Sequence, residues 1–286
     1  LYRRVYAPLL LEPLFAPSPD AYDAEPGESA EACALRRAEQ LAALLEANAG
    51  SVCALVLEPL VQCAGGMRMF HPAYLRRARE LCDAHGVHLI ADEIAVGFGR
   101  TGTLFACEQA GITPDFLCLS KGLTGGFLPM SAVLTTQHVY EAFLDDSRER
   151  AFLHSHSYTG NPLGCAAALA SLAIFDSDDV LARNRGTAAR MAELAAPLAA
   201  HPHVADLRQT GMILAIELVA DRQTRQPFPA ADRRGLRAYR HAIERGVVLR
   251  PLGDILYWMP PYCVGEEELA LLADVTTTAI EEACRP

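Results

Sequence analysis

The chain has 286 residues, of which 51% are hydrophobic, and its net charge is −10 with an isoelectric point near 5.4. That length suits one large domain and a smaller one. The acidic balance argues against nucleic acid or an anionic membrane surface as a partner. No uncharged apolar run reaches the roughly 18 residues of a membrane helix, and no charged-then-apolar leader opens the chain. We therefore expect no membrane span and no secretory signal.

Nine cysteines are scattered along the chain without any C-x-x-C pair. An odd number without paired spacing favours reduced thiols in a cytoplasmic protein over a disulfide framework or a zinc site. We expect no metal centre.

The first 120 residues predict strands that alternate with helices. Leu1 to Gly27, rich in proline and aromatic residues, is typical of an extended connection. After it come apolar runs, which predict strands, and runs with helical spacing, which predict helices. Pro72 is expected in a first helical turn, where proline is favoured. The strands are expected at 52–57, 87–91 and 116–119, and the helices at 35–49 and 72–85.

Each of the three strands ends at an ionisable residue, namely Glu58, Asp92 or Lys121. Strands joined through helices pair in parallel by right-handed crossovers, and such sheets bind ligands outside the carboxyl ends of their strands. The sequence therefore predicts a site at one edge of a mostly parallel sheet.

The second half changes in character near Pro202. Helices are expected at 163–175, 180–200, 232–245 and 266–284, and strands at 204–207, 212–219, 247–250 and 255–259. We predict a large α/β domain over residues 1–200 and a small α+β domain over residues 201–286.

Lys121 lies in the middle of the stretch from Pro114 to Leu134, directly after an apolar run and before Gly122, Gly125 and Gly126. A lysine at the lip of a buried strand is partly desolvated, which favours its neutral, nucleophilic amine. The plainer alternative is a lysine that extends to solvent from a strand end.

Asp92 and Lys121 together match the demands of pyridoxal phosphate chemistry. A lysine amine condenses with the aldehyde, and a carboxylate opposite the pyridine nitrogen keeps that nitrogen protonated. Ile94 would then offer the ring an apolar contact. The alternative for Asp92 is a surface carboxylate or a helix cap.

Five ordered segments carry a resemblance to a known family. ADEIAVGFGRTG at 91–102 and SKGLTGG at 120–126 resemble the class III pyridoxal-phosphate aminotransferases, and three further segments resemble the biotin-pathway branch. These are VQCAGGMRMFHP at 61–72, HSHSYTGNP at 154–162 and RPLGDILYWMPPY at 250–262. The resemblance implies a fold-type-I transferase with helices on both faces of its sheet, working as a cytoplasmic homodimer with shared active sites.

The resemblance also implies roles for individual residues. Lys121 matches the Schiff-base lysine and proton shuttle, Asp92 the partner of the pyridinium nitrogen, and Arg250 the arginine that grips a substrate carboxylate. A loop expected to reach the neighbouring subunit's cofactor phosphate and substrate contains Ser155, His156 and Ser157.

Four further residues are assigned less narrowly. Arg100 either discriminates between the two substrates or holds the glycine loop through an ion pair. Tyr257 and Gln62 are expected to line the site, and Glu58 either touches the ligand or orients groups behind it.

By this resemblance the reaction is the transfer of an amino group to 7-keto-8-aminopelargonate, with S-adenosylmethionine or lysine as the donor. The alternatives are another class III aminotransferase acting on an ω-amino acid, and a catalytically silent relative. Full-length members carry an upstream stretch with a phosphate cup and an aromatic residue that stacks on the ring. Neither can be placed in this sequence, which begins at Leu1 rather than Met and so suggests a fragment.

Overall fold

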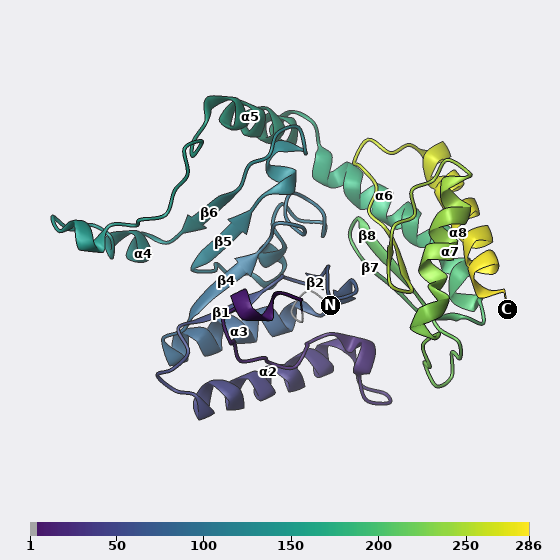
Figure 1. Ribbon diagram of the computed structural model, residues 1–286, viewed down its shortest axis with the longest axis horizontal. Coiled ribbons are helices and arrows are strands. Elements are labelled where there is room, and N and C mark those ends of the chain that lie inside the picture. The colour runs from purple at the N-terminus through teal and green to yellow at the C-terminus, as the bar shows by residue number, and fades with distance from the viewer. Residues whose placement is uncertain (1–4, 286) are drawn as a thin grey trace.

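Two β-sheets organise the chain, and a computed structural model describes residues 5–285 (Figure 1). The extended connection expected over residues 1–27 is largely irregular where it is described, with short 3₁₀ turns η1 (Ala7–Leu9) and η2 (Ala21–Asp23). Its first four residues lie outside the described part. Among residues 5–285, no helix has both the length and the apolar composition that crossing a membrane requires.

The first sheet has the strand order β1-β4-β5-β6. Its strands are β1 (Ala54–Leu57), β4 (His88–Asp92), β5 (Phe116–Leu119) and β6 (Ala132–Thr135). The first three are parallel, as predicted, whereas β6 pairs antiparallel with β5. Helix α3 (Pro72–His85) provides the crossover from β1 to β4. Its start is capped by His71, and it ends at Gly86, whose φ of 65° stops the helix.

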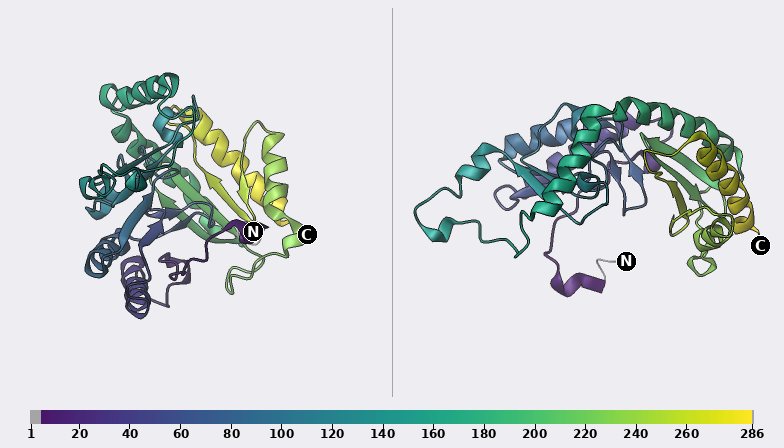
Figure 2. Two further views of the ribbon diagram at one scale, coloured as in Figure 1. Left: turned by 60° about the vertical axis from the view of Figure 1, so that its left-hand side comes forward. Right: turned by 90° about the horizontal axis from the view of Figure 1, so that it is seen from above.

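Helices cover both faces of this sheet (Figures 1 and 2). Helices α2 (Ala30–Ala47) and α3 pack together on one face, where Leu41, Leu75 and Leu89 are buried in one core cluster. Helix α5 (Pro162–Ser177) lies against the other face, where Ala168 joins a smaller cluster. The remaining short elements are α4 (Gln137–Glu141), η3 (Ala106–Ala110), η4 (Lys121–Thr124) and η5 (Arg148–Arg150).

The second sheet is antiparallel, with the order β7-β8-β10-β9. Its strands are β7 (Val204–Thr210), β8 (Ile213–Leu218), β9 (Pro251–Leu252) and β10 (Ile255–Trp258). All six residues of β8 are buried, because alternate side chains enter different cores. Leu214 and Ile216 face the small-domain cluster, while Ile213 and Ala215 join the cluster of the first sheet.

Three helices enclose the outer face of this second sheet. They are α6 (Val180–Ala195), α7 (Arg234–Ile243) and α8 (Glu266–Cys284), with η6 (Ala196–Ala200) and η7 (Ala230–Asp232) between elements. Met191 and Ala195 of α6 are fully buried in the small-domain cluster. Helix α6, predicted as part of the large domain over residues 1–200, therefore packs with the C-terminal sheet.

Two local expectations were wrong or incomplete. The strand expected at 247–250 is not formed, and pairing begins only at Pro251, because β10 returns from the turn at Gly253–Asp254 and reaches only Pro251 and Leu252. A small antiparallel hairpin, β2 (Val61–Gln62) and β3 (Arg68–Met69), was not anticipated.

Candidate active site

The three predicted ionisable residues lie at the same edge of the first sheet. Glu58 directly follows β1, Asp92 ends β4, and Lys121 comes two residues after β5. The register pairs Leu57 with Ala91 and Asp92 with Cys118, so the strands end at nearly the same height. The three residues therefore share the carboxyl edge of the sheet, as predicted.

Electrostatics tie these groups together. Burial raises the pKa of Glu58, and the negative charge of Asp92 raises it further. The hydrogen bond from the Cys63 N–H and the positive charge of Lys121 both lower this pKa. The Cys63 N–H donates to Glu58 Oε2 at 3.1 Å. Burial and then Glu58 also raise the pKa of the Cys63 thiol to about 12, so this thiol is not a nucleophile near neutral pH.

Lys121 sits in an unusual backbone conformation. Its φ is 40°, in the left-handed region that a residue with a side chain rarely adopts. The turn is held because Leu123 N–H donates to Ser120 O at 2.9 Å and Ser120 Oγ donates to Met130 O at 2.7 Å. A strained non-glycine residue at a sheet edge is a recurrent mark of functional sites.

The side chain of Lys121 is exposed, so the expectation of partial desolvation was wrong for this chain. The residue lies beyond the end of β5 on the turn η4, past the shelter of the strand. Lys121 is also the single lysine of the 286-residue sequence, all other basic side chains of the Lys and Arg count being arginines.

Asp92 is half-buried, and its Oδ1 accepts the N–H of Ile94 at 3.1 Å. This short loop fixes the orientation of the carboxylate and places the half-buried Ile94 beside it. The alternative of a helix cap does not apply, because Asp92 closes a local turn and no helix begins after it.

Sequence reasoning missed the neighbouring Glu93, which is fully buried. Its two carboxylate oxygens accept the N–H groups of Ala106 and Cys107 at 2.7 and 2.8 Å. Glu93 therefore anchors the loop that follows GFGRTG. The only sequence signal was the adjacent pair of acidic residues after an apolar strand.

Arg100 joins the glycine loop to the small domain. Its Nη1 donates to Pro260 O at 2.6 Å, and its guanidinium lies 4.4 Å from the centre of the Tyr262 ring. Burial lowers the pKa of Arg100, while Tyr262 opposes that shift. Arg100 does hold the loop, but through a carbonyl and a ring rather than through the expected ion pair.

Arg250 and Tyr257 come from the small domain. Arg250 is exposed just before β9, and none of the carboxylates in the described residues forms an ion pair with it. Tyr257, opposite Ala215 in the sheet, is half-buried and packs against the cluster of the first sheet. Gln62 accepts a hydrogen bond from Ser18 at 3.1 Å.

The structure does not bring the loop of Ser155, His156 and Ser157 into the body of the chain. All three residues are exposed, and the hydrogen bonds of His156 stay within the local turn 156–159. They belong to residues 142–160, here called the arm, which runs from α4 to α5 outside the sheet (Figures 1 and 2). The turn ends where Asn161 caps α5 by accepting the N–H of Gly164 at 2.7 Å.

A mostly parallel sheet with helices on both faces, a small antiparallel domain and a lysine at the carboxyl edge define a fold-type-I transferase. The family model described as Aminotransferase class-III matches residues 2–280, and the chain belongs to this family.

The chain is similar to curated proteins named adenosylmethionine-8-amino-7-oxononanoate aminotransferase. That of Nitratidesulfovibrio vulgaris is 47% identical over 281 residues, covering 98% of this chain and 52% of that protein. That of Aquifex aeolicus is 40% identical over 284 residues, covering 99% and 62%. The chain thus spans between half and two thirds of the length of these relatives.

Solved structures agree. The crystal structure of the like-named protein from Methanocaldococcus jannaschii superposes with a TM-score of 0.89 at 34% identity, covering 98% of this chain and 62% of that one. An omega transaminase from Pseudomonas jessenii in complex with PMP gives 0.86 at 31% identity, covering 93% and 59%.

Proposed function

We propose that this chain carries the lysine-bearing part of a pyridoxal-phosphate aminotransferase that converts 7-keto-8-aminopelargonate into 7,8-diaminopelargonate in biotin biosynthesis. The observation that carries the proposal is the arrangement of Lys121 and Asp92 at one sheet edge, on a turn whose backbone is strained. The names of the relatives at 40–47% identity support the substrate.

The residues present fit pyridoxal phosphate. When bound, this cofactor supplies an aldehyde and an electron-withdrawing ring for amino-group exchange. The exposed amine of Lys121 is free to condense with an aldehyde and, once released, to move a proton. The oriented carboxylate of Asp92 suits a protonated ring nitrogen, and Ile94 offers an apolar surface beside it.

Substrate binding is assigned to the small-domain side. Arg250 is exposed and without a carboxylate partner in the described chain, which suits bidentate binding of a substrate carboxylate. Tyr257 packs against the cluster of the first sheet, and Arg100 joins the glycine loop of that sheet to Pro260 of the small domain; both are proposed to shape the pocket. The proposed donor is S-adenosylmethionine, with lysine as the alternative.

We also propose a homodimer in which the arm of one subunit supplies His156 and Ser157 to the other. The arm and the elements next to it expose an unusual number of large apolar side chains, more than a monomer normally leaves in water. They are Val133, Leu134, Phe143, Leu144, Phe152, Leu153, Tyr158, Leu163, Leu169 and Ile174. The nine free cysteines favour a reducing, cytoplasmic location.

A second candidate is transamination of another ω-amino acid, favoured by the omega transaminase among the similar structures. A panel of amino donors and keto acceptors separates the two activities. Formation of 7,8-diaminopelargonate supports the first, whereas turnover of simple ω-amino acids alone would replace it.

The first test is covalent attachment of pyridoxal phosphate to the purified protein, followed by borohydride reduction and peptide mapping. Because Lys121 is the only lysine, the modified peptide should be unique, and Lys121→Ala should abolish both attachment and turnover while the protein stays folded. Turnover that survives in Lys121→Ala would contradict the mechanism. A folded wild-type protein that never attaches the cofactor would instead support a silent relative.

A further inference from the structure

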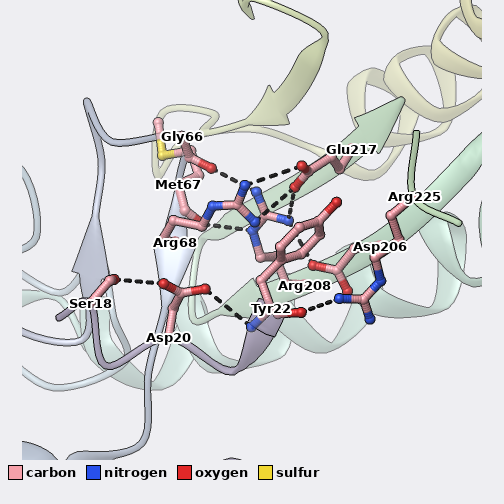
Figure 3. A network of polar contacts seen from close by, with 10 residues as sticks. All are labelled: Ser18, Asp20, Tyr22, Gly66, Met67, Arg68, Asp206, Arg208, Glu217 and Arg225. Carbon is pink, nitrogen blue, oxygen red and sulfur yellow. Dashed lines mark hydrogen bonds and ion pairs between the residues drawn. The ribbon is translucent and has the colours of Figure 1, made fainter. Parts of the chain in front are cut away.

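Figure 3 shows a polar network in which the small domain reaches a strained turn of the large domain. The β2–β3 hairpin turns through Gly66 and Met67, whose φ angles of 103° and 52° are both left-handed. From β7, Arg208 donates its Nε to Met67 O at 2.7 Å and its Nη2 to Gly66 O at 2.6 Å. This conformation is unfavourable for a residue that carries a side chain, so the turn needs outside support.

Arg208 is itself held firmly. Its Nη1 donates to Asp206 Oδ2 at 2.6 Å and to Glu217 Oε2 at 2.7 Å. Glu217 also binds both terminal nitrogens of Arg68, at 3.1 and 3.2 Å, and the ring of Tyr22 lies 3.8 Å from the Arg68 guanidinium carbon. The side chains of Arg208 and Glu217 are each 11% exposed. A guanidinium that is buried and paired on every side has no freedom to reorient.

The supported turn is connected to the candidate active site by hydrogen bonds in series. The N–H groups of Gly66 and Met67 donate to Cys63 O at 3.2 and 3.0 Å. The N–H of Cys63 in turn donates to Glu58 Oε2 at 3.1 Å. The peptide groups on either side of Cys63 thus link the carbonyls held by Arg208 to the Glu58 carboxylate, which interacts electrostatically with Asp92 and Lys121.

From this series of contacts we propose that Arg208 is a positioning residue: by bracing the Gly66–Met67 turn from the small domain, it fixes the Glu58 carboxylate beside Lys121. Arg208 touches neither cofactor nor substrate. It acts through the hairpin, and docking of the small domain therefore sets the charge environment of the lysine. The importance of that lysine rests on the proposed function, whereas the geometry does not.

The physical consequence concerns Glu58. Burial is the main cause that raises the pKa of this carboxyl, and the hairpin segment contacts it through the Cys63 N–H. If the brace is loosened, water reaches Glu58, which lowers its pKa, while the Cys63 N–H bond that also lowers this pKa weakens. Burial is the larger of the two effects, so the net change expected is a fall toward the ordinary glutamate range. Glu58 interacts electrostatically with Cys63, Asp92 and Lys121. The titration of Glu58 can therefore be followed from Lys121.

The test uses Lys121 as a reporter in cofactor-free protein. Reductive methylation with ¹³C-formaldehyde labels this single lysine and the terminal α-amine. The NMR shift of the lysine methyl carbons, assigned by their absence in Lys121→Arg, is followed against pH. Wild type should show an inflection above the ordinary glutamate range that vanishes in Glu58→Gln. In Arg208→Lys, which keeps the charge but loses the planar fork, the inflection should fall by about half a pH unit or more.

A matched control is Arg190→Lys, which alters a half-buried arginine of α6 whose ion-pair partners are Glu193 and Glu266 rather than the hairpin. Its inflection should equal that of wild type. If Arg208→Lys does not fold, Glu217→Gln carries the test, since it weakens the support of Arg208 while keeping volume, and a downward shift is again expected. An unchanged inflection in the folded variant, or no Glu58-dependent inflection in wild type, would overturn the proposal.

This readout needs no cofactor, so it stands apart from the proposed activity. If the protein proves inactive but the inflection moves, the positioning role holds and the function fails. If the protein is active, the pH profile of turnover should shift in Arg208→Lys in the same direction as the NMR inflection.

Discussion

Phe98 occupies the space into which a side chain at position 122 would extend: a methyl group on Gly122 would lie 2.8 Å from both Cβ and Cδ2 of Phe98. Phe98 has a φ of 56° and Lys121 a φ of 40°, so two strained residues pack through one glycine. The turn that carries the lysine therefore depends on the absence of a side chain beside it.

Gly122→Ala should displace this turn. The clash with Phe98 is expected to cost about 1–3 kcal/mol and to reduce covalent attachment of pyridoxal phosphate to Lys121, measured by absorbance and borohydride trapping. Gly186→Ala is the control, because nothing lies within 4 Å of the added methyl group on α6. Normal attachment in Gly122→Ala would show that the turn tolerates repacking.

Tyr262→Phe tests the support of Phe98 from the small domain. The Tyr262 hydroxyl donates to Phe98 O at 2.6 Å, and its loss leaves that carbonyl unpaired, at an expected cost of about 1–3 kcal/mol in unfolding free energy. Chemical denaturation of both proteins at neutral pH measures this difference in unfolding free energy.

The stabilities of wild type and Tyr262→Phe should respond differently to alkaline pH. Burial raises the pKa of Tyr262 from 10.0 to about 12, so the unfolded chain loses this proton first and wild-type stability falls as the pH rises from 10 toward 12. Tyr262→Phe lacks this loss. The stability gap between the two should therefore narrow over that range, and a constant gap would contradict the assignment.

Arg250→Ala should weaken binding of the carboxylate substrate. A charge-assisted hydrogen bond contributes about 1.5–3 kcal/mol, which corresponds to a rise in KM of roughly 10- to 150-fold with little change in cofactor affinity. Arg245→Ala removes an exposed arginine whose described contacts are His241 and Glu244, and should leave KM unchanged. Equal KM values in both variants would mean that another residue binds the carboxylate.

Leu153→Asp should weaken the proposed homodimer. Leu153 is 86% exposed on the arm, where a buried charge at an interface would be unpaired. Sedimentation should show a shift from dimer to monomer at micromolar concentration. Leu271→Asp on α8, where the leucine is 48% exposed, is the control and should remain dimeric. A dimer that survives in Leu153→Asp would place the interface elsewhere.

The regular elements of the chain were largely readable from local patterns. The helix at 72–85 has a proline start and a glycine stop, and the strand at 116–119 is bounded by turn residues, so both were predicted with the observed limits. The closing helix 266–284 was predicted as well. In each case the signal lies within the segment itself.

Features that depend on distant partners were not readable. Residues 247–250 alternate between buried and exposed, as a strand does, but pairing starts at Pro251 because β10 sets the register. The bracing of Met67 by Arg208 joins residues 141 apart in sequence, and no local pattern signals it.

In the candidate site, too, some features could be predicted from local patterns and others could not. The edge formed by Glu58, Asp92 and Lys121 followed from strand topology. The exposure of Lys121 and the engagement of Arg100 by Pro260 depend on turns and on contacts between the sheets, which composition and periodicity do not encode. The proposed role of the arm comes from the family resemblance and from the large apolar side chains that the arm exposes.

Strand β8 has no solvent face, since Ile213 and Ala215 enter one cluster and Leu214 and Ile216 the other. Separating the sheets would expose two buried residues of β8 and the charged network of Glu217 and Arg208 together. The two layers should therefore melt as one cooperative unit, giving a single calorimetric transition with equal van't Hoff and calorimetric enthalpies. A gene cut near residue 200 would then yield two pieces that aggregate rather than two soluble domains.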